Sequence, residues 1–183
     1  MLLTCETARL SLQCLTSASA LAVRNFYLEN QPYFDPYELT RPEAFYTIGF
    51  QTSLMDWEWK EMQAKHGLRY YLFLKNEPTV IIGSVNFSDI RFGCMQKASI
   101  GYKIDHRYWH QGFAYEACSK CLDIIFREYD LHRIEAHIAP SNQPSVRLIQ
   151  KLGFSYEGLE HEAAQINHHW QDLYQFAKLN PHH

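Results

Sequence analysis

Hydrophobic and polar positions follow two kinds of pattern along the first third of the chain. They alternate over residues 7–15, which predicts a first β-strand. Residues 17–30 read as a helix, with Thr16 or Ser17 able to cap its start. A turn-rich, aromatic connection follows, and residues 42–65 then predict a second helix. We therefore expect the chain to open with one strand and two helices.

The remainder of the chain alternates between strand-like and helix-like patterns. Strands are predicted at residues 69–75, 79–90, 97–104, 133–139, 154–163 and 170–179, and helices at 113–129 and 143–151. Residues 76–78 make the turn between the first two of these strands, and Gly153 ends the last helix. This order predicts one mixed α/β (α+β) domain over residues 1–183, with a mostly antiparallel sheet flanked by helices.

Composition and charge narrow the class of protein. The chain has 183 residues, 46% hydrophobic and 20% charged, which fits one folded domain with its own core. A formal net charge of -3 gives no reason to expect binding to nucleic acid. No apolar run approaches the ~20 residues that span a bilayer, and the opening residues lack a signal-peptide pattern. We therefore expect a cytoplasmic protein that binds neither nucleic acid nor membrane.

Five cysteines raise the question of disulfides or metal binding. Their number is odd and their spacing irregular, so a disulfide framework is not expected. Cys118 and Cys121 form a CxxC pattern, but both fall on the apolar stripe of the predicted helix at 113–129. No second CxxC completes a zinc site. We expect both to be small buried core residues, a usual role for free cysteine.

The turn before that helix carries the first chemical signal. Residues 107–117 read RYWHQGFAYEA, with Gly112 immediately before the helix. The first N–H groups of a helix have no partner within it and favour an anion such as a diphosphate. Glycine at this point lets a ligand oxygen approach the backbone without meeting a Cβ. The alternative is a plain strand-to-helix turn that needs glycine for its geometry.

This segment resembles the central motif of the GNAT acyltransferases. In that family a strand leads into a pyrophosphate loop of pattern Gln/Arg-x-x-Gly-x-Gly/Ala, which falls here on residues 109–114. Trp109 occupies the first position of this pattern, where the family usually has Gln or Arg. A tryptophan there, followed by Tyr/Thr-Glu-Ala, resembles the Rim-type branch of ribosomal-protein N-terminal acetyltransferases.

Further matches bracket the central motif. ETARLSL near the start resembles the opening strand of that branch, and WQDLYQFAKL resembles its closing strand. The segment from 132 to 154 resembles the second half of the fold, with Arg133, Glu135, Asn142, Ser145, Lys151, Gly153 and Phe154 as its key elements. The resemblance covers nearly the whole chain and is weakest over residues 30–66, where the family builds its acceptor pocket.

The resemblance implies a binding mode for acetyl-CoA, without a metal. The strand near 99–104 and the strand near 133–139 should splay apart and admit the pantetheine arm, which pairs with the open strand edge. The diphosphate should sit on the amides of residues 110–115. The implied cofactor-binding residues are Tyr102, Ile104, Trp109, His110, Gln111, Gly112, Phe113, Ala114, Tyr115, Asn142 and Lys151.

The implied reaction is direct attack of an amine on the thioester, which needs a proton for the leaving thiolate. In the Rim-type branch the serine matching Ser145 is the proposed donor. Many other GNAT enzymes use a tyrosine further along the same helix, and that position is Ile149 here. The alternative for Ser145 is a helix-start hydroxyl that bonds to the backbone. Asn142 could cap the helix, contact the cofactor, or do both.

Two residues are candidates for the base that takes the amine's proton. Strand alternation puts Arg133, Glu135 and His137 on one face of the predicted strand at 133–139. Glu135 or His137 could accept the proton, through water if needed. The alternatives are an ion pair of Glu135 with Arg133 or another basic residue, and a half-buried polar role for His137. The base is therefore left open between these two.

Two further segments bear on the acceptor. Asp35 and Glu38 could attract a cationic substrate or be ordinary loop residues. The His- and Glu-rich segment 160–170 is expected to be a solvated loop between the last two strands, without the regular spacing of a zinc site. His182 and His183 are set aside.

Taken together, the sequence predicts an acetyl-CoA-dependent N-acetyltransferase, monomeric or homodimeric. The expected acceptor is the α-amine of a protein or peptide N-terminus. A small-molecule amine such as a polyamine, amino acid analogue or antibiotic is the alternative acceptor. A non-catalytic acetyl-CoA sensor also stays open, because fold alone does not fix function.

Overall fold

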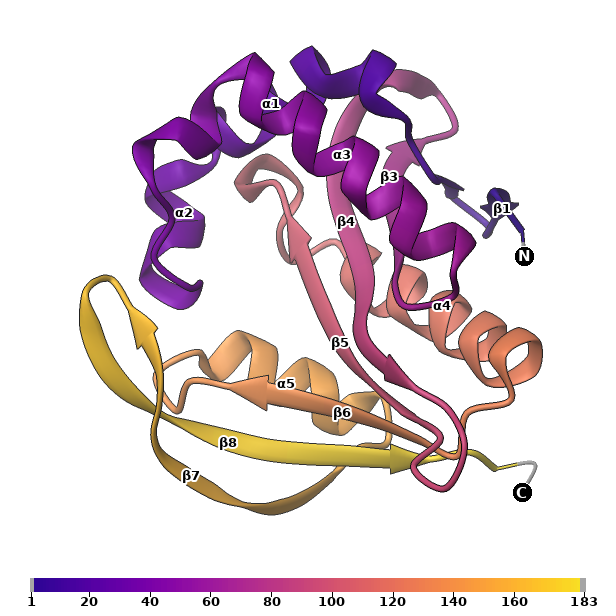
Figure 1. The fold of residues 1–183 in the computed structure, drawn as a ribbon, viewed down its shortest axis with the longest axis vertical. Coiled ribbons are helices and arrows are strands. Elements are labelled where there is room, and N and C mark those ends of the chain that lie inside the picture. The colour runs from indigo at the N-terminus through magenta and orange to yellow at the C-terminus, as the bar shows by residue number, and fades with distance from the viewer. Residues whose placement is uncertain (1, 182–183) are drawn as a thin grey trace.

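The computed structural model describes residues 2–181 and shows a twisted sheet with helices on both faces (Figure 1). The strands are β1 (Thr4–Glu6), β2 (Leu10–Gln13), β3 (Leu68–Leu74), β4 (Glu77–Arg91), β5 (Lys97–Ile104), β6 (Arg133–Ile138), β7 (Ser155–Ile166) and β8 (His169–Leu179). The α-helices are α1 (Ala20–Glu29), α2 (Gln31–Phe34), α3 (Ile48–Gln63), α4 (Phe113–Tyr129) and α5 (Gln143–Lys151). The predicted mixed fold is confirmed, whereas His182 and His183 lie outside the described residues.

Pairing within the sheet creates an opening at its centre. Over the described residues the strand order is β1-β2-β3-β4-β5-β6-β8-β7. All neighbours pair antiparallel except β5 and β6, which are parallel. The β5–β6 pairing covers only Lys97–Ser99 against Arg133–Glu135, so the two strands separate beyond that point. This confirms the expected splay and leaves the rest of β5 bonded to β4 alone.

The core consists of two apolar layers, one on each face of the sheet. Helix α4 packs with strands β2 to β6 around residues such as Ile125, Leu72 and Ile134, all fully buried. On the other face, α1 and α3 cover β3 and β4 through a second cluster that includes Val23 and Met55. No helix within residues 2–181 has both the length and the apolar character needed to cross a membrane.

The CxxC cysteines belong to the first of these layers. Cys118 and Cys121 are both fully buried on α4, as the helix periodicity predicted. Burial raises the pKa of each thiol, so both stay protonated and unreactive. Within the described residues no group of three or more His, Cys, Asp or Glu side chains is placed to hold a metal ion.

The starts of the first two helices differ from the prediction. Residues 17–19 form a 3-10 turn before α1, and Thr16 makes no side-chain cap. The segment predicted as one helix from 42 to 65 is divided. A 3-10 turn covers Glu43–Tyr46, and α3 begins after Thr47, whose hydroxyl accepts the Phe50 N–H at 3.3 Å. The extended backbone of a capping threonine interrupts a helical pattern that side-chain periodicity alone cannot divide.

The loop expected within residues 160–170 is shorter than predicted, because the predicted strands at 154–163 and 170–179 extend toward each other. Strand β7 continues to Ile166 and β8 begins at His169, so only Asn167 and His168 form the turn. Register shifts between Glu160 and Ala164 mark a bulge within this hairpin. Such a bulge breaks the polar–apolar alternation that the prediction used to recognise strands. Strand β1 and the entry of Glu77 and Pro78 into β4 were also not predicted.

Candidate active site

The separated part of β5 leads directly to the loop before α4. The loop is tied to the strand by Trp109, whose indole N–H donates to the Ile104 carbonyl at 2.7 Å. Its ring also lies edge-on against Tyr33 of α2. Trp109 therefore holds the loop against the end of β5, so that strand edge and helix start form one continuous surface.

The start of α4 has the geometry expected of an anion site. Gly112 has a φ of +81°, the left-handed region that favours glycine. The first backbone bond of the helix runs from Glu116 N–H to the Gly112 carbonyl at 3.1 Å, so the N–H groups of Phe113, Ala114 and Tyr115 precede it. A Cβ at Gly112 would meet only Arg9, at 3.5 Å, so the protein leaves the space beside this turn open.

A brace from the other end of the chain holds this loop. Glu116 accepts the Thr7 hydroxyl at 2.6 Å and the Arg9 backbone N–H at 2.9 Å. The Arg9 guanidinium donates to Glu116 at 2.7 Å and to the Gln111 carbonyl at 2.9 Å. Burial alone would raise the pKa of Glu116, but these bonds lower it and keep it ionised. Thr7 and Arg9 belong to the segment ETARLSL, which the sequence pattern identified as an opening strand. Their contacts with Glu116 could not be predicted from that pattern.

Tyr115 and Lys151 extend the surface past the helix start. The Lys151 ammonium lies 4.6 Å from the centre of the Tyr115 ring. Beside Tyr115, a groove of about 210 Å³ runs between α4 and the end of β8, with Ser119 and Lys178 among its lining residues. Cationic and aromatic groups therefore stand next to the candidate anion site, where the charged end of a nucleotide could be received.

At the opening between β5 and β6, a serine and a tyrosine face each other. Asn142 caps α5 by accepting the Ser145 N–H at 3.2 Å, as one alternative predicted. The Ser145 hydroxyl does not bond back to the backbone; it lies 2.7 Å from the Tyr102 hydroxyl. Tyr102 also donates to the Ser145 carbonyl at 3.2 Å. Thus the predicted strand residue and the predicted helix residue form one hydroxyl pair, a contact that sequence reasoning missed.

The two candidate bases have different surroundings. Glu135 is buried and accepts bonds from Arg133 at 2.8 Å and from Lys97 at 3.0 Å. Burial alone would raise the pKa of Glu135, but these two cations lower it. The predicted Arg133 ion pair is therefore present, and a carboxylate so stabilised is a weak proton acceptor. His137 lies further along β6, past the last residue paired with β5, with Nε2 3.5 Å from Glu160 of β7.

A contact joins two segments that are distant in the chain, the loop after α2 and the β7–β8 hairpin. Leu39 forms a β-bridge with Ile166 near the tip of the β7–β8 hairpin. Thr40 donates its N–H to the Gln165 carbonyl at 3.3 Å and accepts the His168 N–H at 3.0 Å. Figure 1 shows this hairpin reaching toward α2. The loop after α2 and the hairpin therefore form a strap, defined here as residues 38–42 with 165–168.

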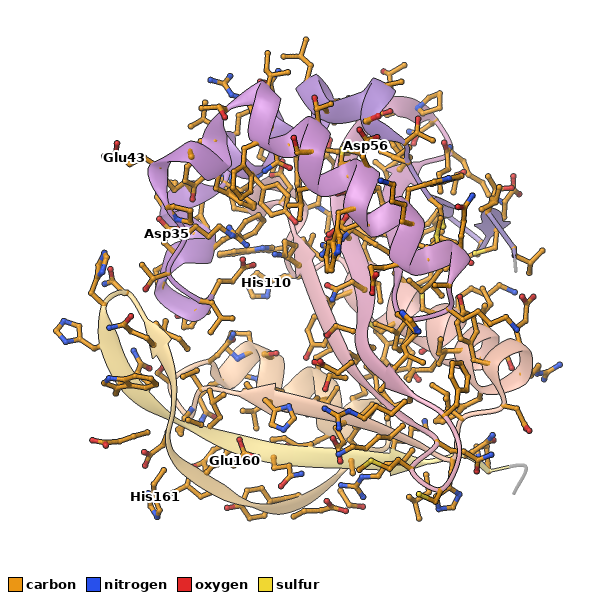
Figure 2. The ribbon with its side chains drawn as sticks, in the orientation of Figure 1. Asp35, Glu43, Asp56, His110, Glu160 and His161 are labelled. Atoms are coloured by element: carbon orange, nitrogen blue, oxygen red, sulfur yellow. The ribbon has the colours of Figure 1, made fainter. Side chains whose placement is uncertain are left out.

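Beneath the strap, the loop carboxylates already have partners. Glu38 binds the half-buried Lys103 side-chain nitrogen at 2.6 Å and also pairs with Arg41. Asp35 accepts the Tyr46 hydroxyl at 3.2 Å. Figure 2 shows Asp35 near α2 and Glu160 on β7, on opposite sides of the region around His110. The two cations beside Glu38 support the interpretation of that carboxylate as a loop residue, whereas the neutral hydroxyl that donates to Asp35 leaves its charge in place.

Comparison with known proteins extends these observations. The model of the family described as the acetyltransferase (GNAT) domain matches residues 9–155. The probable N-acetyltransferase YjcK of Bacillus subtilis is 31% identical over 153 residues, 84% of each chain. The ribosomal protein uS5-alanine N-acetyltransferase of Escherichia coli is 28% identical over 176 residues, 96% of this chain and 90% of that protein. The structure of ribosomal-protein-S5-alanine acetyltransferase from Vibrio fischeri superimposes with a TM-score of 0.92 at 26% identity, covering 97% of both chains.

Proposed function

Because this chain belongs to the GNAT acetyltransferase family, we propose that it acetylates the N-terminal α-amine of a protein or peptide. The chain is an acetyl-CoA-dependent N-acetyltransferase, so the proposal concerns the acceptor and the residues. The observation that carries it is the extent of similarity to the uS5-alanine enzyme. That similarity covers 96% of this chain and therefore includes the acceptor side as well as the cofactor side.

The residues proposed to hold acetyl-CoA lie along one path. The N–H groups at the start of α4, after Gly112, would bind the diphosphate. The separated edge of β5, at Tyr102 and Ile104, would pair with the pantetheine arm. His110, Gln111 and Trp109 shape the turn, while Asn142 and Lys151 flank the path from α5. Their arrangement fits a long, negatively charged thioester because the path joins an anion site to a strand edge.

The proposed chemistry is a single direct transfer. The acceptor nitrogen attacks the thioester carbonyl carbon, the carbon–sulfur bond breaks, and an amide and free CoA thiol are formed. The nitrogen must lose a proton, and the sulfur must gain one. Ser145 is proposed to donate its hydroxyl proton to the sulfur and to regain a proton from solvent as CoA leaves, since its hydroxyl lies at the opening where β5 and β6 separate.

His137 is the better candidate for the base. It stands past the last β5–β6 pair, whereas Glu135 is held between Arg133 and Lys97. An α-amine has an ordinary pKa of about 8, so about a tenth of it is already neutral near pH 7. A half-exposed imidazole is sufficient to remove the remaining proton after attack. A lysine amine, at about 10.4, would need a stronger base than this site provides.

The test is release of free thiol from acetyl-CoA with a panel of amines. The panel contains peptides with Ala or Ser at the N-terminus, the same peptides with a blocked N-terminus, and polyamines, amino acids and aminoglycosides. We expect turnover with the free peptides and none with their blocked forms, and mass spectrometry should place the acetyl group on the α-nitrogen. Turnover confined to small amines, or acetylation of lysine side chains in blocked peptides, would contradict the proposal.

A further inference from the structure

We propose that Tyr102 is a positioning residue that directs the Ser145 hydroxyl toward the sulfur of the bound thioester. This inference rests on the proposed role of Ser145 as donor to the leaving thiolate. The two hydroxyl oxygens are 2.7 Å apart, within the range of a good O–H···O bond. The residues come from different elements, β5 and α5, and are 43 positions apart in the chain.

Two hydrogen-bond arrangements are possible for the hydroxyl groups of Tyr102 and Ser145. A carbonyl oxygen can only accept, so when Tyr102 donates to the Ser145 carbonyl, the bond between the hydroxyls must carry the Ser145 proton. When Tyr102 donates to Ser145 Oγ instead, the Ser145 proton is released from the pair. It can then point at a third acceptor. A sulfur gaining negative charge is such an acceptor, and it favours the second arrangement.

The surroundings keep Tyr102 in the donor form. It is half-buried against the core, and burial raises its pKa well above the ordinary value of about 10, although the bond with Ser145 opposes this. The hydroxyl is therefore protonated throughout the physiological range. At the same time, the Asn142 cap fixes the first turn of α5, so that rotation about the Ser145 side chain is the main remaining freedom.

The pair also explains how α5 acts without a tyrosine of its own. Ile149, one turn beyond Ser145, is fully buried and apolar. No hydroxyl can reach the opening from that position. Tyr102 provides one from the facing strand, at a point where β5 has already separated from β6. The hydroxyl that contacts Ser145 therefore comes from Tyr102 of β5 and not from a residue further along α5.

The experiment compares Tyr102→Phe with Ser145→Ala and with the double variant, using any amine that the panel shows to be accepted. We expect Tyr102→Phe to lower kcat about 10-fold, the size of one lost hydrogen bond. KM for acetyl-CoA and calorimetric CoA affinity should not change. The double variant should be no slower than Ser145→Ala, because Tyr102 acts only through Ser145. Tyr108→Phe removes a hydroxyl bonded to Glu77 outside the pair and serves as the matched control.

Leaving-group dependence separates this role from a purely structural one. With acetyl thioesters of more acidic thiols, the thiolate needs less help, so the deficit of Tyr102→Phe should shrink. An unchanged kcat, additive effects of the two substitutions, or a deficit equal for all thiols would overturn the inference. A higher KM with kcat intact would instead make Tyr102 a cofactor contact. These outcomes do not depend on which amine is the acceptor. An error in the proposed acceptor would therefore be detected by the amine panel and not by this experiment.

Discussion

Arg9 and Glu116 are joined at 2.7 Å although 107 residues separate them in the chain. Their contact brings the first strands against the first turn of α4, where Gly112 precedes the proposed diphosphate site. Arg9 has a second function in the same place, because it also donates to the Gln111 carbonyl. The geometry of the loop is therefore set partly by residues that precede it by about a hundred positions.

Replacing Arg9 by Ala should weaken binding of acetyl-CoA about 3- to 10-fold, because the Gln111 carbonyl loses its donor. The thermal midpoint should change little, since Arg9 is half exposed and exposed ion pairs contribute little stability. Arg9→Lys is the matched control: it keeps the charge but cannot reach both Glu116 and Gln111. Calorimetry of CoA binding would measure the change. Equal affinities for all three proteins would show that the loop does not need the brace.

Gly112→Ala should reduce acetyl-CoA affinity by more than its effect on stability explains. A non-glycine residue at a φ of +81° costs about 1–2 kcal/mol of folding free energy. Its Cβ would also occupy the space beside the helix start. Gly153→Ala provides the control, because Gly153 has a nearly identical φ of +84° and lies at the far end of α5. Both variants should lose similar stability, as measured by denaturant unfolding, and only Gly112→Ala should lose CoA binding.

Glu135→Gln should change how the free energy of unfolding depends on pH. The folded protein lowers the pKa of Glu135, so the stabilising contribution of this group is present above about pH 4.3 and is lost as pH falls through the lower folded value. At pH 7 the variant should be about 2 kcal/mol less stable, the range for bonds to a charged group. The difference should diminish below pH 4. A difference that stayed constant down to pH 2 would mean that the ion pairs are not the source of the stability.

His137→Gln should slow turnover, by about 100-fold if this imidazole accepts the proton. The loss should be greater for an aliphatic amine than for an α-amine, because a more basic nitrogen depends more on the base. Binding of acetyl-CoA should be unaffected. Parallel measurement of Glu135→Gln decides between the two candidates: a larger rate loss there would assign the base to Glu135 instead.

Helix and strand patterns predicted most of the fold because they depend on local periodicity. Helices α4 and α5 begin and end at the predicted residues, and β5 matches as well. The Asn142 cap was predictable for the same reason, since a cap acts within one turn. Where the outcome differed, a local irregularity was responsible. Thr47 divided one predicted helix, and the bulge between Glu160 and Ala164 broke the alternation, so that the strand predicted at 154–163 was ended before Ile166.

The candidate site was predictable as a set of residues and not as a set of contacts. Gly112 and Ser145 could be placed because each lies at the start of a helix. Nothing in their spacing indicated that Tyr102 would meet Ser145, since that contact depends on how α5 packs against β5. The second cation beside Glu135 posed the same difficulty: Lys97 reaches it from β5, the only parallel neighbour among the described strands.

The strand order has a consequence for how a new copy of the protein is made. Strand β8 (His169–Leu179) is synthesised after the other described strands, yet it lies between β6 and β7 and is the antiparallel partner of both. A growing chain can hold Gly112 and α4 in place early, because those contacts use residues already made. The half of the sheet that supports His137 can close only after β8 has left the ribosome. Premature termination before residue 169 would therefore leave β6 paired only with β5, over Lys97–Ser99, and would leave β7 without its partner β8.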